Sequence, residues 1–227
     1  MNWDIPRENL AVSAYRCRHI RRRPLRVRQG RSMWFANRPT RYLQYATLLL
    51  GLCGALPAQA NPWMSAPPLP DIEVRDQDGR PLQFYSDLLR GRTVIIDFIF
   101  TECTTVCPTQ TAILRDVRNR LSDSKINQGE VLLISVTVDP QHDGPQQLRE
   151  YAQRFEIAPG IRQGWVFVTG EPRELNKLLS ALNSATSQPA NHSNILWIGN
   201  EPQQRWTRTA AFNPPQHFTQ LLREIAR

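Results

Sequence analysis

The stretch that most constrains the fold is T-V-I-I-D-F-I-F-T-E-C-T-T-V-C-P, residues 93–108. Its first part, 93–100, is an apolar run rich in β-branched residues, which is typical of a buried central strand in a parallel sheet. After Pro108 the apolar residues recur with a helical period, which predicts a helix from about Thr109 to Leu121. Cys103 and Cys107 are therefore expected where a strand passes into a helix.

This position favours reactive sulfur. A helix start leaves backbone N–H groups unpaired and carries the positive end of the helix dipole, and both stabilise a thiolate relative to a thiol. A cysteine there is expected to have a lowered pKa. The pattern indicates a site for redox chemistry or for a soft metal ion.

The rest of the chain alternates strand and helix patterns. The Asp78-Gly79 turn predicts a hairpin ahead of the central strand, and Ser86 is a candidate cap for the turn behind it. The further strands are expected at 131–138, 165–168, 194–198 and 205–209, and the further helices at 144–155, from 172 and from 215. Parallel crossovers followed by an antiparallel hairpin predict an α/β, thioredoxin-like fold, with a central mixed sheet flanked by helices and an N-terminal hairpin extension.

The strongly basic balance of the chain belongs to its N-terminal part. Residues 1–60 hold 11 of the 28 basic and 2 of the 20 acidic residues, so 61–227 carry 17 basic against 18 acidic residues. A domain with this balance lacks the net positive charge typical of proteins that bind phosphate backbones. We therefore expect no nucleic-acid partner.

Residues 1–60 resemble an export leader. An apolar run, 42–56, is followed by Pro57-Ala58-Gln59-Ala60, an ending that suits signal peptidase. Two alternatives remain open: an uncleaved membrane anchor at 42–57, and a true start at Met33, which would give a signal of ordinary length. We expect a linker at 61–70 and one folded domain at 71–227.

Cleavage after Ala60 would leave an exported protein with Cys103 and Cys107 as its cysteines. In an oxidising compartment such a pair can form a disulfide. The loop it would close is very short, so it would constrain the unfolded chain little. A chemical role is therefore the preferred interpretation over a structural staple.

His192 is the histidine best placed to face the cysteines. In a fold with this order, the loop entering the last hairpin, 187–193, passes beside the strand-to-helix junction. Two thiolates and one imidazole form a soft, low-coordinate donor set suited to Cu(I). Three protein ligands do not complete a tetrahedral structural zinc site.

Three segments of the chain resemble a known family. They are D-F-I-F-T-E-C-T-T-V-C-P-T-Q-T at 97–111, S-V-T-V-D-P-Q-H-D-G-P-Q-Q-L-R-E-Y-A-Q-R-F at 135–155, and N-H-S-N-I-L-W-I at 191–198. They are similar to the Sco (SenC) family of copper-binding, thioredoxin-like proteins that assemble cytochrome c oxidase. The resemblance covers about residues 70–227.

By this resemblance Cys103, Cys107 and His192 are the copper ligands. The resemblance also implies delivery of copper to the binuclear copper site of cytochrome c oxidase, or reduction of the cysteines of that site. The expected partner is the copper-bearing subunit of the oxidase or another periplasmic copper or thiol protein. The expected location is the periplasm, either soluble after cleavage or anchored to the inner membrane.

Three further residues are expected to influence the site. Many members of the family have Asp where this chain has Asn191, so a partner of the ligand histidine is expected to be lost and the copper affinity lowered. Asp97 lies in an apolar strand, so its pKa should be raised and it could accept a proton during thiol–disulfide exchange. The alternative for Asp97 is a strand-end acid paired with an arginine. Asp139 ends the next strand and is expected at the same sheet edge.

Two functions stay open at this point. One is a copper chaperone that holds the ion with Cys103, Cys107 and His192. The other is a thiol–disulfide oxidoreductase without a metal role, in which Cys103 attacks a partner's disulfide and Cys107 resolves the mixed disulfide.

Overall fold

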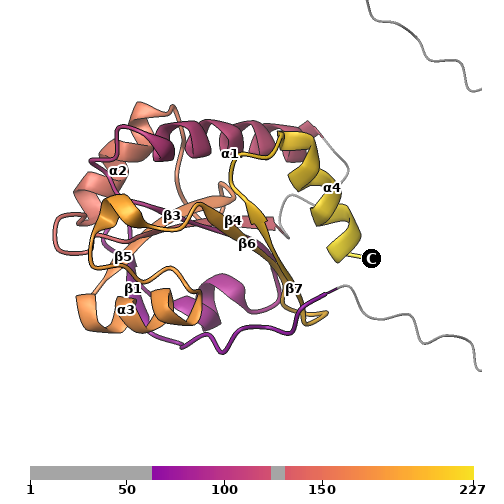
Figure 1. The fold of residues 1–227 in the computed structure, drawn as a ribbon, viewed down its shortest axis with the longest axis horizontal. Helices are drawn as coiled ribbons and strands as arrows, with labels where there is room; N and C mark the ends of the chain where they lie inside the picture. The colour runs from indigo at the N-terminus through magenta and orange to yellow at the C-terminus, as the bar shows by residue number, and fades with distance from the viewer. Residues whose placement is uncertain (1–62, 124–130) are drawn as a thin grey trace, which may run out of the picture. The chain divides into compact units, whose positions relative to one another are not determined.

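The computed structural model describes residues 63–123 and 131–227, which form a seven-stranded mixed sheet in the order β2-β1-β5-β4-β3-β6-β7 (Figure 1). The strands are β1 (Glu73–Asp76), β2 (Pro81–Gln83), β3 (Thr93–Ile99), β4 (Val131–Thr137), β5 (Trp165–Gly170), β6 (Ile195–Asn200) and β7 (Arg205–Ala210). The helices are α1 (Val106–Asp123), α2 (Pro145–Arg154), α3 (Pro172–Ala181) and α4 (Pro215–Ile225), with a π-helix η1 (Phe84–Leu89) and a 3-10 helix η2 (Pro189–Asn191).

The connections confirm the predicted fold class. β3, β4 and β5 are parallel, and α1 and α2 form the two crossovers between them. After β5 the chain returns through α3, and β6 then lies antiparallel to β3 on its other side. The end of β3 and the entrance to β6 therefore meet at one edge of the sheet.

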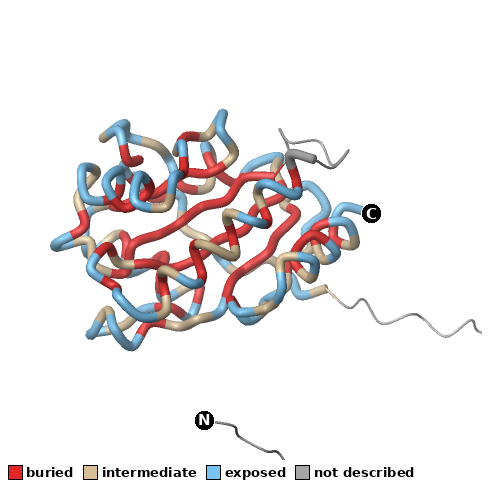
Figure 2. The backbone as a smooth tube through the Cα atoms, turned by 90° about the horizontal axis from the view of Figure 1, so that it is seen from above, coloured by how far each residue is buried: buried red, intermediate tan, exposed pale blue. Residues whose placement is uncertain are grey.

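Two hydrophobic cores cover the two faces of the sheet. Along β3, Ile95 and Ile99 pack with α1, α2 and α4, whereas Val94, Ile96 and Phe98 pack with α3 and η1. Figure 1 shows these helices on opposite sides of the strands, and Figure 2 shows that the buried stretches follow the central strands. Since side chains alternate along a strand, this pattern places Asp97 on the face covered by α1.

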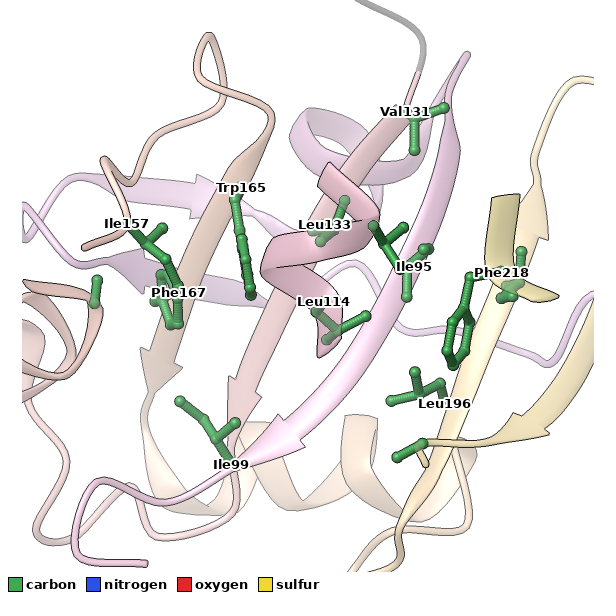
Figure 3. Packing of buried hydrophobic residues seen from close by; sticks show 14 of the residues in the cluster. Ile95, Ile99, Leu114, Val131, Leu133, Ile157, Trp165, Phe167, Leu196 and Phe218 are labelled. Carbon is green, nitrogen blue, oxygen red and sulfur yellow. The ribbon is translucent and has the colours of Figure 1, made fainter. Parts of the chain in front are cut away.

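The core under α1 contains large side chains from four neighbouring strands. Figure 3 shows Ile95, Leu133, Trp165 and Leu196 side by side, with Leu114 of α1 among the residues that cover them. Each Å² of apolar surface that these side chains bury stabilises the fold by about 25 cal/mol. This burial holds α1 against the sheet. The start of α1 is therefore held in a defined place relative to β3.

The N-terminal hairpin is confirmed, with Val74 of β1 opposite Leu82 of β2. The expected cap at Ser86 is wrong. The helix begins earlier, at Phe84, so Ser86 lies within it, and the Ser86 hydroxyl donates to the carboxylate of Asp71 at 2.5 Å.

The segment before the hairpin contacts the sheet. Met64 pairs with Trp206 of β7 through two backbone hydrogen bonds, and Leu69 packs against the core on the α3 face. Among the described residues, no helix is long and apolar enough to cross a membrane. The predicted leader, 1–60, including the apolar run at 42–57, lies outside the described residues.

Candidate metal centre

The two cysteines occupy different structural positions. Cys103 lies in the turn after β3, where its N–H donates to the carbonyl of Phe100. Cys107 lies in the first turn of α1, which begins at Val106 and so earlier than the predicted start at Thr109. The prediction was wrong because Pro108 sits inside the first turn, where a helix does not need the N–H that proline lacks.

His192 meets the cysteines at the predicted edge. It follows η2 immediately, and its Nε2 lies 3.4 Å from the Sγ of Cys107. The two sulfurs and a ring nitrogen of His192 all lie within 4.8 Å of one another, and all three residues are buried. A thiolate sulfur binds a first-row transition metal ion such as zinc at about 2.3 Å. Two sulfurs on opposite sides of one such ion would therefore be about 4.6 Å apart. The three donors can therefore share a single ion.

The imidazole of His192 is neutral and presents Nε2 toward the cysteines. Its Nδ1–H donates to the carbonyl of Ser193 at 3.1 Å, which leaves the lone pair on Nε2 directed toward Cys107. Burial lowers the pKa of His192, which keeps the ring uncharged near neutral pH. The ring of Phe100 packs edge-on against the imidazole, with centroids 5.9 Å apart.

The two thiols differ in acidity. Burial raises the pKa of Cys103, but hydrogen bonds from the thiol and the backbone N–H of Cys107 outweigh this effect and lower the pKa below its ordinary value. Burial raises the pKa of Cys107, and the hydrogen bond to Cys103 raises it further. Cys103 is thus the more acidic thiol of the pair, and Cys107 retains its proton.

Asp97 is fully buried in β3. Its Oδ1 accepts from the hydroxyl of Ser135 at 2.7 Å and its Oδ2 from the amide of Gln110 at 3.1 Å. Burial raises the pKa of Asp97 to about 6, the direction expected from the sequence. No arginine contacts this carboxylate in the described part of the chain, so the alternative of a strand-end ion pair is wrong.

Asp139 lies just beyond β4 but does not join the three donors. Its carboxylate accepts from Nδ1 of His142 at 2.9 Å. It borders a surface hollow shared with Arg173 and with Pro189 of the His192 loop. No hydrogen bond connects Asp139 to the cysteines or to His192 within the residues described, and its expected effect on the site stays a prediction.

Sequence reasoning missed two partners of the site. The first is the backbone carbonyl of Ser193, which accepts the hydrogen bond from His192 that an acidic neighbour was expected to accept. The side-chain amide of Asn191 donates to Gln188 instead. The second is Gln110, which holds Asp97. Its position three residues after Cys107 places it on the same face of α1, and this helical spacing was the available signal.

Comparison with known proteins supports the motif-based resemblance. The SCO1/SenC family model matches residues 70–226. The SCO1 protein homolog of Bacillus subtilis is 36% identical over 96 residues, which are 42% of this chain and 46% of that protein. A putative copper-binding protein of Stutzerimonas stutzeri is 34% identical over 114 residues, 50% of this chain and 51% of that protein. The chain thus spans about half the length of the curated relatives it matches.

Solved structures share the fold. A SCO1/SenC family lipoprotein from Bacillus anthracis has a TM-score of 0.60 at 23% identity, covering 70% of this chain and 95% of its own. Arabidopsis thaliana ScoI with copper bound has a TM-score of 0.57 at 20% identity, covering 69% of this chain and 96% of its own. At these identities the likeness carries the fold alone.

Proposed function

The chain belongs to the SCO1/SenC family, and from this premise we propose that it binds a copper ion through Cys103, Cys107 and His192 and transfers it to a partner protein. The observation that carries the proposal is the convergence of two sulfurs and one imidazole nitrogen within 4.8 Å. Soft sulfur donors together with imidazole favour Cu(I) over harder divalent ions. The matched relative described as a putative copper-binding protein supports the same ligand.

The side chains have distinct parts in this binding. The more acidic Cys103 and the free Nε2 of His192 offer two lone pairs to an incoming ion, and Cys107 becomes the third ligand once it loses its proton. Three donors leave room for a ligand from the recipient protein. Copper can then leave by stepwise ligand exchange, so that it is never released free into solution.

We propose an exported copper protein as the recipient, with the copper-bearing subunit of cytochrome c oxidase as the leading candidate. Support comes from a structural neighbour, BsSco, described as a member of the Sco family of cytochrome c oxidase assembly proteins. The work would take place in the periplasm. The protein would be soluble after cleavage near Ala60, or attached to the inner membrane through 42–57.

A second candidate function is reduction of a partner's disulfide, and the unequal acidity of the two thiols favours it. The Cys103 thiolate attacks one sulfur of the disulfide and releases the other as a thiolate, giving a mixed disulfide. Cys107 then loses its proton and attacks Cys103, which releases the second partner thiol. The products are an oxidised Cys103–Cys107 pair and a reduced partner. The recipient's copper-binding cysteines are the proposed substrate.

Titration of the reduced full chain with Cu(I), in competition with a chromophoric chelator, tests the copper proposal. We expect one tightly bound ion per chain. Loss of a residue that supports a metal ligand lowers metal affinity by ~10–100-fold, so His192→Ala, which removes a ligand itself, should lower it at least as much. His142→Ala is the matched control, because His142 is exposed and bonded to Asp139. Equal affinity in His192→Ala, together with strong reduction of insulin disulfides, would reject the chaperone and leave the oxidoreductase.

A further inference from the structure

Cys103 is the last residue of a tight turn that follows β3. Its N–H donates to the carbonyl of Phe100 at 3.1 Å, which closes a four-residue β-turn with Thr101 and Glu102 at its centre. Glu102 is exposed, whereas Thr101 is buried. The place of the Cys103 sulfur therefore depends on how Thr101 is held.

The carboxylate of Asp143 holds Thr101 from one side. Asp143 lies between β4 and α2 and is buried. Its Oδ1 accepts from the hydroxyl of Thr101 at 2.5 Å, and its Oδ2 accepts from the backbone N–H of Thr101 at 3.0 Å. Oδ2 also accepts from the hydroxyl of Thr137 at 2.6 Å, which ties the carboxylate to the end of β4. Asp143 thus fixes both the backbone and the side chain of Thr101.

Arg154 holds Thr101 through its carbonyl. This arginine is the last residue of α2, and its guanidinium donates to the carbonyl of Thr101 at 2.7 Å. The guanidinium also lies over the ring of Tyr151, 5.2 Å from the centroid, and this contact restricts its direction. Thr101 is therefore bonded through its N–H, its hydroxyl and its carbonyl, by one residue just before α2 and one at its end.

The other two donors of the metal centre have supports of their own. Cys107 lies in α1, which packs in the core, and the carbonyl of Ser193 holds the ring of His192. Cys103 lies in neither a helix nor a strand, so the bonds to Thr101 supply the corresponding support. A ligand group that is already held in place loses less conformational freedom when it binds a metal ion, and this favours affinity.

We propose that Asp143 and Arg154 are positioning residues of the metal centre, which keep the Cys103 sulfur beside the other two donors by holding Thr101. The inference rests on the proposed binding of copper by the three donors. Without the bonds to Thr101 the turn samples other arrangements. The apparent affinity then falls in proportion to the fraction of molecules in which the three donors are close together.

Competition for Cu(I) between the reduced full chain and a chromophoric chelator tests this role. Asp143→Ala removes both bonds from the carboxylate to Thr101 and should lower the affinity by about 10–100-fold, the range for residues that support metal ligands. Asp143→Asn should stay within about threefold of wild type, because its Oδ1 can accept from the N–H and its amide can donate to the hydroxyl. Glu150→Ala, which removes an exposed carboxylate of α2, should match wild type.

Arg154→Met is the milder variant, because Arg154 is exposed and the change removes one bond to Thr101. It should lower the affinity by about 2–10-fold, which is what one hydrogen bond is worth. Arg173→Met, which changes an exposed arginine of α3, is the control. A loss of stability alone does not change the affinity of the folded protein, so these shifts report positioning. Should Asp143→Ala fail to fold, Arg154→Met decides the question.

Amide hydrogen exchange of the metal-free reduced chain gives a reading that does not depend on copper. Exchange at the Cys103 N–H should become faster in Arg154→Met relative to exchange at Ile96, which lies in the middle of β3. Unchanged affinity and unchanged exchange in the variants would overturn the positioning role alone. An equal loss in Asp143→Asn and Asp143→Ala would also overturn it, because charge would then be the cause. Wild type that binds no Cu(I) would instead overturn the proposed function.

Discussion

The Sγ of Cys107 lies 3.4 Å from the Nε2 of His192, although 85 residues separate them in the chain. The contact exists because β6 pairs with β3, which places the loop entering β6 beside the junction of β3 and α1. A backbone carbonyl holds the far side of the imidazole ring. The pairing of β6 with β3 therefore determines how the two sulfurs and the imidazole are arranged.

The two thiols should react with iodoacetamide at different rates. The pKa of Cys103 is lowered and that of Cys107 is raised, and the thiolate is the reactive form. At pH 7 we expect Cys103 to be alkylated at least about tenfold faster, since each pKa unit changes the thiolate fraction tenfold. Fragment-ion mass spectrometry after short labelling locates the adduct. Equal labelling, or faster labelling of Cys107, would contradict the assigned acidities.

Asp97→Asn should change how stability depends on pH. The pKa of Asp97 is about 6 in the folded chain and 3.8 as a model group. Between about pH 4 and 6 the unfolded state ionises this acid while the folded state keeps it protonated, so the unfolding free energy of wild type falls as the pH rises. The loss is on the order of 3 kcal/mol and persists above this window.

The Asn variant lacks this penalty. Its stability relative to wild type should therefore increase from pH 4 to pH 7 and then level off. Urea unfolding of both reduced proteins at several pH values measures the difference, in which the titration of all other groups largely cancels. A difference that does not vary with pH would show that the folded-state pKa is not raised.

Asn191→Asp should leave copper affinity within about tenfold of wild type. Changing a residue that hydrogen-bonds a metal ligand typically alters metal affinity by about 10–100-fold, and residue 191 makes no such bond within the residues that the structure describes. The reason is geometric, because residue 191 is turned toward Gln188 while the Nδ1–H of His192 is bonded to Ser193. Competition with a Cu(I) chelator gives the ratio. A large gain in affinity would show that an acid here does reach the imidazole, as the sequence had suggested.

The buried hydroxyl pair of Thr111 and Tyr151 provides a test of the core between α1 and α2. Their oxygens are 2.7 Å apart and both side chains are buried. Tyr151→Phe should lower the unfolding free energy by about 1–3 kcal/mol, because it leaves the Thr111 hydroxyl without its partner.

Adding Thr111→Val to Tyr151→Phe should cost little more, since the unsatisfied group is then removed. Chemical denaturation of Tyr151→Phe, Thr111→Val and the double variant gives the three unfolding free energies needed for this comparison. Simple additivity of the two losses would mean that the hydroxyls do not act as a pair.

The order of elements was predictable because apolar periodicity and helix-starting prolines, as at Pro172 and Pro215, mark it locally. The π-helix at Phe84–Leu89 was missed, since its wide turn, closed by the Arg90 N–H on the Tyr85 carbonyl, has no simple sequence signal. The start of α1 at Val106 was not predictable from Pro108, because proline is tolerated within the first turn of a helix as well as just before it.

The meeting of Cys103, Cys107 and His192 followed from topology, since adjacent strands fix which loops are neighbours. The direction of an amide does not follow from topology. Asn191 and Gln110 depend on side-chain torsions and on competition among nearby acceptors, which a pattern of residue types does not encode.

The position of β6 beside β3 also has a consequence for the order of events during synthesis. A ribosome that has translated only as far as α3 has made both sulfurs but not the imidazole. Such an unfinished polypeptide lacks His192, and it gains this third donor only when the C-terminal hairpin pairs with the central strand. The set of three donors is thus present only in chains whose sheet is complete.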